Sequence, residues 1–199
     1  MITRLPLEPE KLVASMLYIA HRVSDPTKWR IGKLVFLGDF AHLARYGRPV
    51  VGGRYCAMPN GPVPSEVLGL MNGLLTRQID PIFWGTNVEN SFRVVEGGRY
   101  PHFVPTVEAN LEALSESDIE VLDEMLKTYG SMSFGDLSGF VHGLPAYVRA
   151  TEREPDSKNP DMDYEDFFEE NPFSVDGTKA QMIEDYALNR AFPEVATKA

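Results

Sequence analysis

Cysteine and paired histidines are almost absent from this sequence. Its 199 residues contain one cysteine, Cys56, which excludes an internal disulfide framework and a multi-cysteine zinc site. The four histidines lie far apart, without the i, i+4 or His-x-His spacing of metal-binding pairs. They are His21, His42, His102 and His142. Since the glycine patterns of nucleotide-binding loops are also missing, we expect neither a metal nor any other cofactor.

Long apolar segments are missing as well. No run of about 18 apolar residues occurs, so no segment is suited to cross a bilayer as a helix. Residues 1–12 contain proline and acidic residues where a secretory signal would need a continuous apolar stretch. We therefore expect a soluble, cytoplasmic protein that has no membrane partner.

Apolar residues are nevertheless plentiful, at 43% of the chain with 11% aromatic, which is enough to build a core. The length suits one domain, or one domain with an appendage. The net charge of −10 is uneven, because residues 152–176 hold ten acids and two bases while the rest of the chain is close to neutral. A local acidic run of this kind is typical of a linker or of a surface that meets a basic partner.

Helical periodicity dominates the first half of the sequence. Apolar residues at helical spacing predict a helix over residues 9–23 and another over residues 30–46. The second of these is apolar nearly all round, as a helix in the middle of a core would be. A third helix is expected over residues 64–77, and Gly47 stands where a left-handed C-cap is needed.

The second half is expected to begin with strands and to end in helices. Residues 92–95 and 100–104 flank two glycines and predict a β-hairpin, and residues 83–84 are a candidate for a further short strand. Ser115 and Asp118 have capping-box spacing and open a helix that extends to residue 129. The remaining helices are expected over residues 133–142, from residue 145, and over residues 178–199.

A segment dense in proline and glycine lies between these halves. Residues 48–64 contain seven of these residues, which predicts an ordered loop with a defined backbone path. The sequence as a whole indicates an α+β fold that is mainly α-helical: a compact helical domain with a small antiparallel β-hairpin sheet, then a C-terminal acidic arm and a helix. We expect a domain over residues 1–151, an acidic aromatic arm over 152–177 and an amphipathic helix over 178–199.

One arrangement in the second helix suggests catalysis. Asp39 and His42 lie three residues apart and share a helix face, as an acid–histidine pair for general-base chemistry would. The alternative is a polar cluster that packs the following loop, which we favour because a catalytic site would show more partners. A nucleophile would have to be Cys56, and lone cysteines are more often buried apolar residues than reactive thiols. We therefore predict no catalytic residue.

Two charged segments are candidates for binding. Residues 28–54 contain six bases and one acid, which suggests phosphate contacts, solvated flanks of a core helix or a counter-surface for the acidic segment. Because the whole chain is acidic and no DNA-reading motif is present, we do not expect a nucleic-acid partner. The acidic segment is either an extended arm that anchors in a partner or a segment that folds back on its own domain. Its large apolar residues are Met162, Tyr164, Phe167, Phe168 and Phe173.

Several motifs follow one another in a fixed order. KLVFLGDFAHLARYGRP begins at Lys33, GRY at Gly53, NGPVPS at Asn60 and LSESD at Leu114. A last group consists of Leu122, Tyr129-Gly, Leu137-Ser and His142. In this order the motifs resemble the Panacea domain of SocA-like, phage-associated antitoxins over about residues 9–150.

The resemblance implies a non-enzymatic antitoxin of a type II toxin–antitoxin system, which neutralises a cognate toxin by direct protein–protein binding. For the SocA branch it also implies delivery of the toxin to a protease, so a proteolytic adaptor is an alternative. From the residues themselves, a small hydrolase-like enzyme that uses Asp39 and His42 and a transcriptional regulator are further alternatives. The identity of the toxin and the oligomeric state, a homo-oligomer included, stay open.

We expect toxin contacts on two surfaces. One is the loop at residues 48–64 with neighbouring side chains of the second helix, and the other is the acidic aromatic arm. The residues predicted to contact the toxin are Asp39, His42, Tyr46, Arg48, Arg54, Tyr55, Asn60, Pro62, Tyr164, Phe167 and Phe168.

Overall fold

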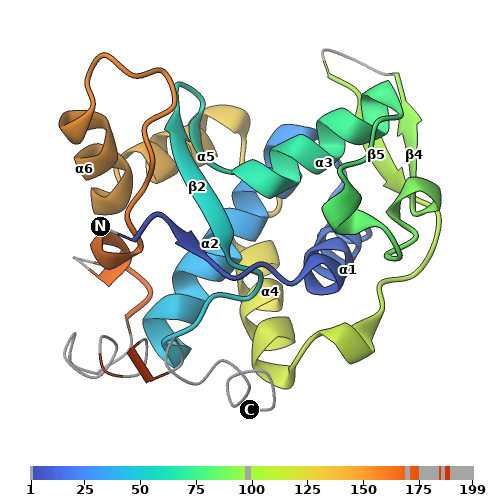
Figure 1. Ribbon diagram of the computed structural model, residues 1–199, viewed down its shortest axis with the longest axis horizontal. Coiled ribbons are helices and arrows are strands. Elements are labelled where there is room, and N and C mark those ends of the chain that lie inside the picture. The colour runs from blue at the N-terminus through green and yellow to red at the C-terminus, as the bar shows by residue number, and fades with distance from the viewer. Residues whose placement is uncertain (1, 97–99, 169–170, 175–183, 185–186, 189–199) are drawn as a thin grey trace.

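The computed structural model describes residues 2–96, 100–168, 171–174, 184 and 187–188 (Figure 1). The α-helices in this part of the chain are α1 (Pro9–Ala20), α2 (Lys28–Tyr46), α3 (Ser65–Thr76), α4 (Glu116–Tyr129), α5 (Phe134–His142) and α6 (Pro145–Arg153). The strands are β1 (Arg4–Leu5), β2 (Gly53–Met58), β3 (Gly61–Pro64), β4 (Phe92–Val95) and β5 (His102–Pro105). The predicted α+β, mainly α-helical fold is confirmed.

Helix α2 lies in the middle of the molecule, with the other helices around it (Figure 1). Every residue from Arg30 to Ala44 is buried, which confirms that this helix belongs in the core. Thr27 caps its N-terminus by accepting a hydrogen bond from the backbone N–H of Arg30. Gly47 ends the helix in the left-handed conformation, with φ 65°, so the predicted C-cap is also confirmed.

The proline- and glycine-rich segment contains two strands, so the prediction of a loop over residues 48–64 is wrong from Gly53 onward, except for the turn between the strands. β2 and β3 form an antiparallel hairpin, and β1 pairs with β2 on its other side. Pro62 and Pro64 are tolerated because β3 is the edge strand of this sheet, where the outward-facing backbone needs no ladder partner. The prolines argued against a strand at residues 61–64 when only the sequence was considered. The strand forms because β3 lies at the edge of the sheet.

The second sheet is the predicted hairpin of β4 and β5. Its glycine turn lies outside the described residues. The candidate strand at residues 83–84 is wrong, because this segment turns as the 3-10 helix η1 (Pro81–Phe83). The side chain of Asp80 caps η1 by accepting a hydrogen bond from the backbone N–H of Ile82, and the proline after Asp80 starts it.

The predicted capping box at the start of α4 is confirmed. The hydroxyl of Ser115 accepts a hydrogen bond from the backbone N–H of Asp118, whose carboxylate accepts one from the backbone N–H of Ser115. Ser133 caps α5 in the same way, through the backbone N–H of Asp136. The helix expected over residues 178–199 lies almost entirely outside the described residues.

The acidic segment after α6 folds back on the domain. The backbone N–H of Ala57 donates to the carbonyl of Pro160, and that of Met162 donates to the carbonyl of Tyr55, both at 2.9 Å. This part of the chain therefore runs beside β2. Of the two alternatives for the segment, the folded-back one is observed, while the division of the chain at residue 151 stays a prediction.

The aromatic residues of this segment belong to the core. Phe167 packs edge-on against Phe36 and Phe40 of α2, with ring centroids 5.9 and 5.0 Å apart. The other large apolar residues of the segment are buried too: Met162, Tyr164, Phe168 and Phe173. The segment thus places these rings inside the domain, and its Asp163 is buried as well, where it accepts a hydrogen bond from the backbone N–H of Ile2.

We expect Phe167→Ala to lower the free energy of unfolding by about 3–5 kcal/mol, because the ring is fully buried and its loss leaves a cavity. Phe134→Ala is the matched control, since this ring is 47% exposed and its removal should cost about 1 kcal/mol or less. Urea unfolding followed by circular dichroism measures both. Equal losses in the two variants would contradict a structural role for the acidic segment.

Candidate functional site

The carboxylate of Asp39 ties the segment after α2 to the middle of that helix. It accepts hydrogen bonds from the backbone N–H groups of Val51 and Gly52, both at 2.8 Å, and from the hydroxyl of Tyr55. Complete burial raises the pKa of Asp39 to about 7, against the opposing effect of these hydrogen bonds. Asp39 therefore holds the turn that leads into β2, which is the packing role favoured from the sequence.

His42 lies one turn later on α2 and is bound through both ring nitrogens. Its Nδ1 is 2.8 Å from the carbonyl oxygen of Arg48, which can only accept, so Nδ1 carries the proton. Its Nε2 then accepts from the hydroxyl of Ser117, at 3.0 Å. Burial and the nearby guanidinium of Arg48 lower the pKa of His42 to about 4, which keeps the ring neutral at pH 7.

Asp118 gathers positive charge at the start of α4. Its carboxylate lies 3.1 Å from Nζ of Lys11 and 2.9 Å from the guanidinium of Arg48. Burial acts to raise the pKa of Asp118, but these two cations lower it overall. These ion pairs connect α1, α4 and the segment that follows α2. Removing one partner would leave an uncompensated buried charge, so we expect the cluster to stabilise this packing.

These polar groups are closed to a substrate. Asp39 and His42 have no exposed surface, and they bind different partners although they share a helix face. Burial raises the pKa of the Cys56 thiol, which disfavours the reactive thiolate. Within the described residues, no group of three or more His, Cys, Asp or Glu residues could hold a metal ion. The enzyme alternative gains no support from this cluster.

An apolar groove opens beside the β2–β3 hairpin and is termed the hairpin groove. It has a volume of about 470 Å³ and lies between the hairpin, the start of α2 and α3. The ring of Trp29 packs on that of Phe134, with centroids 4.4 Å apart. The groove is lined by Lys28, Trp29, Gly32, Lys33, Met58, Pro59, Asn60, Pro62, Val63, Val67, Leu68, Leu75, Tyr100, Pro101 and Phe134. Aromatic and apolar walls with a few polar groups are typical of a binding pocket.

Lys33 lines this groove although its side chain is almost completely buried. Its Nζ donates a hydrogen bond to the carbonyl of Pro62, and a Cβ at Gly61 would lie only 3.0 Å from that nitrogen. Burial lowers the pKa of Lys33 to about 7. Lys33 thus anchors the hairpin turn to α2, and the turn needs a glycine both for this close approach and for its φ of 91°.

The structure separates the residues predicted to contact a toxin into three groups. Arg54, Asn60 and Pro62 lie on the hairpin, where Asn60 is exposed and Pro62, although buried, lines the groove. Tyr46 and Arg48 lie at the C-terminal end of α2, and Tyr46 is 38% exposed. The remaining six are buried: Asp39, His42, Tyr55, Tyr164, Phe167 and Phe168. Whether these six contribute to toxin binding stays a prediction.

The bases of residues 28–54 are held by the protein's own groups. Arg45 makes a two-pronged contact with Glu124, and Arg54 pairs with Asp161 of the acidic segment. Arg30 donates to two backbone carbonyls between α4 and α5. The Arg54–Asp161 pair fits the counter-surface alternative, whereas Glu124 and the carbonyls bound by Arg30 lie outside the acidic segment.

Sequence reasoning missed three of the residues that build this region. The burial of Lys33 could have been predicted, because every face of a helix that is apolar all round packs in the core, so a lysine within it is buried too. Lys11 carries no local signal, and for Asp118 the sequence indicated only the capping box at the start of α4, not the ion pairs. They lie on different helices, α1 and α4, and only the packing of these helices brings the charges together.

A family model described as "Antitoxin SocA-like, Panacea domain" matches residues 31–146 of the chain. The matched part lies inside the range of residues 9–150 that the motifs indicated, and it contains the β2–β3 hairpin, the second sheet and α3 to α5. No curated protein and no solved structure matches the chain.

The buried amine of Lys33 makes stability depend on pH. Its pKa falls from 10.5 in the unfolded chain to about 7 in the folded protein, so the unfolded chain binds the extra proton between these values. We expect the free energy of unfolding of the wild type, relative to Lys33→Met, to rise as the pH increases from 7 to 10.5. The slope should be at most about 1.4 kcal/mol per pH unit.

Urea unfolding over this pH range measures the difference. Lys28→Met on the same helix is the control, because its ammonium group bonds to Asn72 at the surface. Parallel profiles for the wild type and Lys33→Met would show that the Lys33 amine is not desolvated.

Proposed function

This chain belongs to the Panacea-domain family of SocA-like antitoxins, and we propose that it neutralises a cognate protein toxin by binding it directly, as the antitoxin of a type II toxin–antitoxin system. The family match carries this proposal, since it covers more than half of the chain and includes the hairpin groove from residue 31 onward. Inhibition by binding needs affinity and no chemistry. This fits a protein whose polar cluster around His42 and Asp118 is closed to substrates.

The hairpin groove is the proposed contact surface for the toxin. Its wall of Trp29 and Phe134 offers aromatic surface of the kind that dominates the energy of protein interfaces. Asn60 adds exposed polar groups at the tip of the hairpin, and Arg54 lies on the same hairpin beside the groove. The shape is held by the Asp39 and Lys33 contacts, so little ordering is required when a partner binds.

The buried members of the predicted contact set act through this surface. Tyr164 donates a hydrogen bond to the carbonyl of Gly53, and its ring packs on Tyr55 with centroids 5.8 Å apart. Tyr55 in turn donates to Asp39. The acidic segment therefore packs against β2 through Tyr164. Its contribution to toxin binding is to hold the β2–β3 hairpin in position.

A nanomolar complex corresponds to about −12 kcal/mol, which an interface of about 1,600 Å² with a few anchor residues can supply.

Blocking and delivery to a protease differ in their effect on the toxin. If the chain blocks, the toxin persists in an inactive complex; if it delivers, the half-life of the toxin shortens. A chase of toxin levels in cells with and without the antitoxin separates the two.

We expect Leu75→Arg to weaken the complex with the toxin about tenfold or more, because it places a charge on the apolar wall of the hairpin groove. Val107→Arg is the matched control, since both side chains are 39% exposed and Val107 lies outside the groove. The probe is the product of the reading frame adjacent to the gene, measured by calorimetry and by survival on co-expression. Equal affinities of the two variants would remove the groove from the proposal, and failure of the wild type to bind or rescue would contradict the antitoxin function itself.

A further inference from the structure

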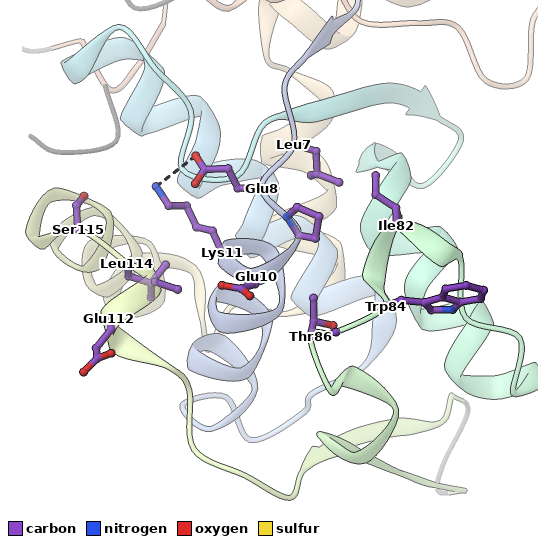
Figure 2. A pocket seen from close by; sticks show the side chains of 13 residues that line it. Leu7, Glu8, Glu10, Lys11, Ile82, Trp84, Thr86, Glu112, Leu114 and Ser115 are labelled. Carbon is purple, nitrogen blue, oxygen red and sulfur yellow. Dashed lines mark ion pairs between the residues drawn. The ribbon is translucent and has the colours of Figure 1, made fainter. Parts of the chain in front are cut away.

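A second groove lies at the N-terminal ends of α1 and α4 and is termed the N-terminal groove. Figure 2 shows its side chains, which come from the start of α1 and the two residues before it, from η1 and the turn after it, and from the segment before α4. Its volume is about 680 Å³, and it shares no lining residue with the hairpin groove. The two grooves can therefore be altered independently.

The charge at this groove is negative. Glu10 and Glu112 are exposed, and Glu8 keeps about half of its side chain exposed. Lys11 also lines the groove, but it is 5% exposed and is paired with Asp118 and Glu8. The two helix N-termini together contribute about one positive charge, which the three glutamates outweigh. The net charge of −10 on the chain adds to the same potential.

One wall of the groove presents a tryptophan to solvent. Trp84 is 75% exposed, the largest exposure among the large apolar side chains described, and Ile82 beside it is 42% exposed. In Figure 2 Trp84 and Ile82 lie on the side of the groove opposite Glu112. The turn that carries them is ordered, because the backbone N–H of Trp84 donates to the carbonyl of Pro81 and the neighbouring Phe83 is buried in the core.

Exposed tryptophan beside carboxylates is a specific combination of chemistries. A tryptophan is a preferred anchor in interfaces because it buries a large apolar area at low entropic cost, and its ring face also attracts guanidinium groups. The glutamates attract cations at longer range and raise the rate of encounter. An anionic or a purely apolar partner would match only part of this surface.

We propose that the N-terminal groove docks a basic segment of the toxin, in which arginine or lysine side chains flank one large apolar side chain. The apolar side chain packs on Trp84 and Ile82, and the cations pair with Glu8, Glu10 and Glu112. This inference rests on the proposed antitoxin function and gives its partner a chemical character: the toxin carries a cationic, amphipathic segment that reaches a surface separate from the hairpin groove.

A peptide experiment tests the chemistry of the groove. The chain has two tryptophans, so Trp29→Phe in the full-length protein leaves Trp84 as the only one and makes its fluorescence a direct reporter. The probe is a synthetic amphipathic peptide with arginines on one face and leucines on the other, and the control peptide has each arginine replaced by glutamate. We expect the arginine peptide to shift the Trp84 emission to the blue and the glutamate peptide to leave it unchanged. No shift, or the same shift with both peptides, overturns the proposal.

Two double variants distinguish the effect of charges at this groove from the effect of the net charge of the chain. Glu10→Lys with Glu112→Lys should weaken peptide binding about tenfold or more, because it reverses two charges at the groove. Glu152→Lys with Glu154→Lys makes the same change in net charge at exposed positions near the end of α6, outside the groove, and should have a much smaller effect. Equal losses in the two double variants would show that only net charge matters and would overturn the assignment.

The same two double variants, in the chain that retains Trp29, are then tested against the product of the adjacent reading frame. A loss of affinity of about tenfold confined to Glu10→Lys with Glu112→Lys supports the groove as a toxin surface. If the wild type and both double variants bind the product equally, the groove assignment is wrong while the antitoxin function stands. If the wild type does not bind the product at all, the proposed function fails, and with it the toxin as the occupant of the groove.

Discussion

The hydrogen bonds that Asp39 accepts from Val51, Gly52 and Tyr55 are the constraint on which the rest of the structure depends. Because α2 is buried along nearly its whole length, the chain that follows it must turn back over the core. The backbone N–H groups of this turn need hydrogen-bond acceptors there. One carboxylate takes two of these groups, and the residues that follow enter β2. The position of the β2–β3 hairpin, and of the groove beside it, follows from this contact.

The acidic segment completes the same unit from the other side of β2. Its backbone bonds to β2, its rings fill the space against α2, and carboxylates such as Asp161 pair with bases at the surface. A segment with this composition can therefore pack on the folded domain, because its aromatic residues are buried while most of its described charges stay at the surface.

The two grooves differ in chemistry in a way that suits a protein that acts by recognition. The hairpin groove is apolar and aromatic, whereas the N-terminal groove combines an exposed tryptophan with three glutamates. Inside the molecule, Asp118 of α4 pairs with Lys11 of α1 and with Arg48, which follows α2. Under the proposed function, surfaces held by such contacts would bind a partner with a small loss of conformational entropy.

Local patterns determined much of this fold. The periodicity of α2, the capping box of Ser115 and Asp118, the left-handed Gly47 and the β4–β5 hairpin each depend on a few neighbouring residues, so the sequence was sufficient to predict them. The same holds for the packing role favoured for Asp39. Only the tertiary structure decided where the acidic segment lies, that β3 is an edge strand that accepts prolines, and that Lys11 meets Asp118. These features depend on contacts between residues far apart in the chain, whose energies appear only when the helices are packed and water is excluded.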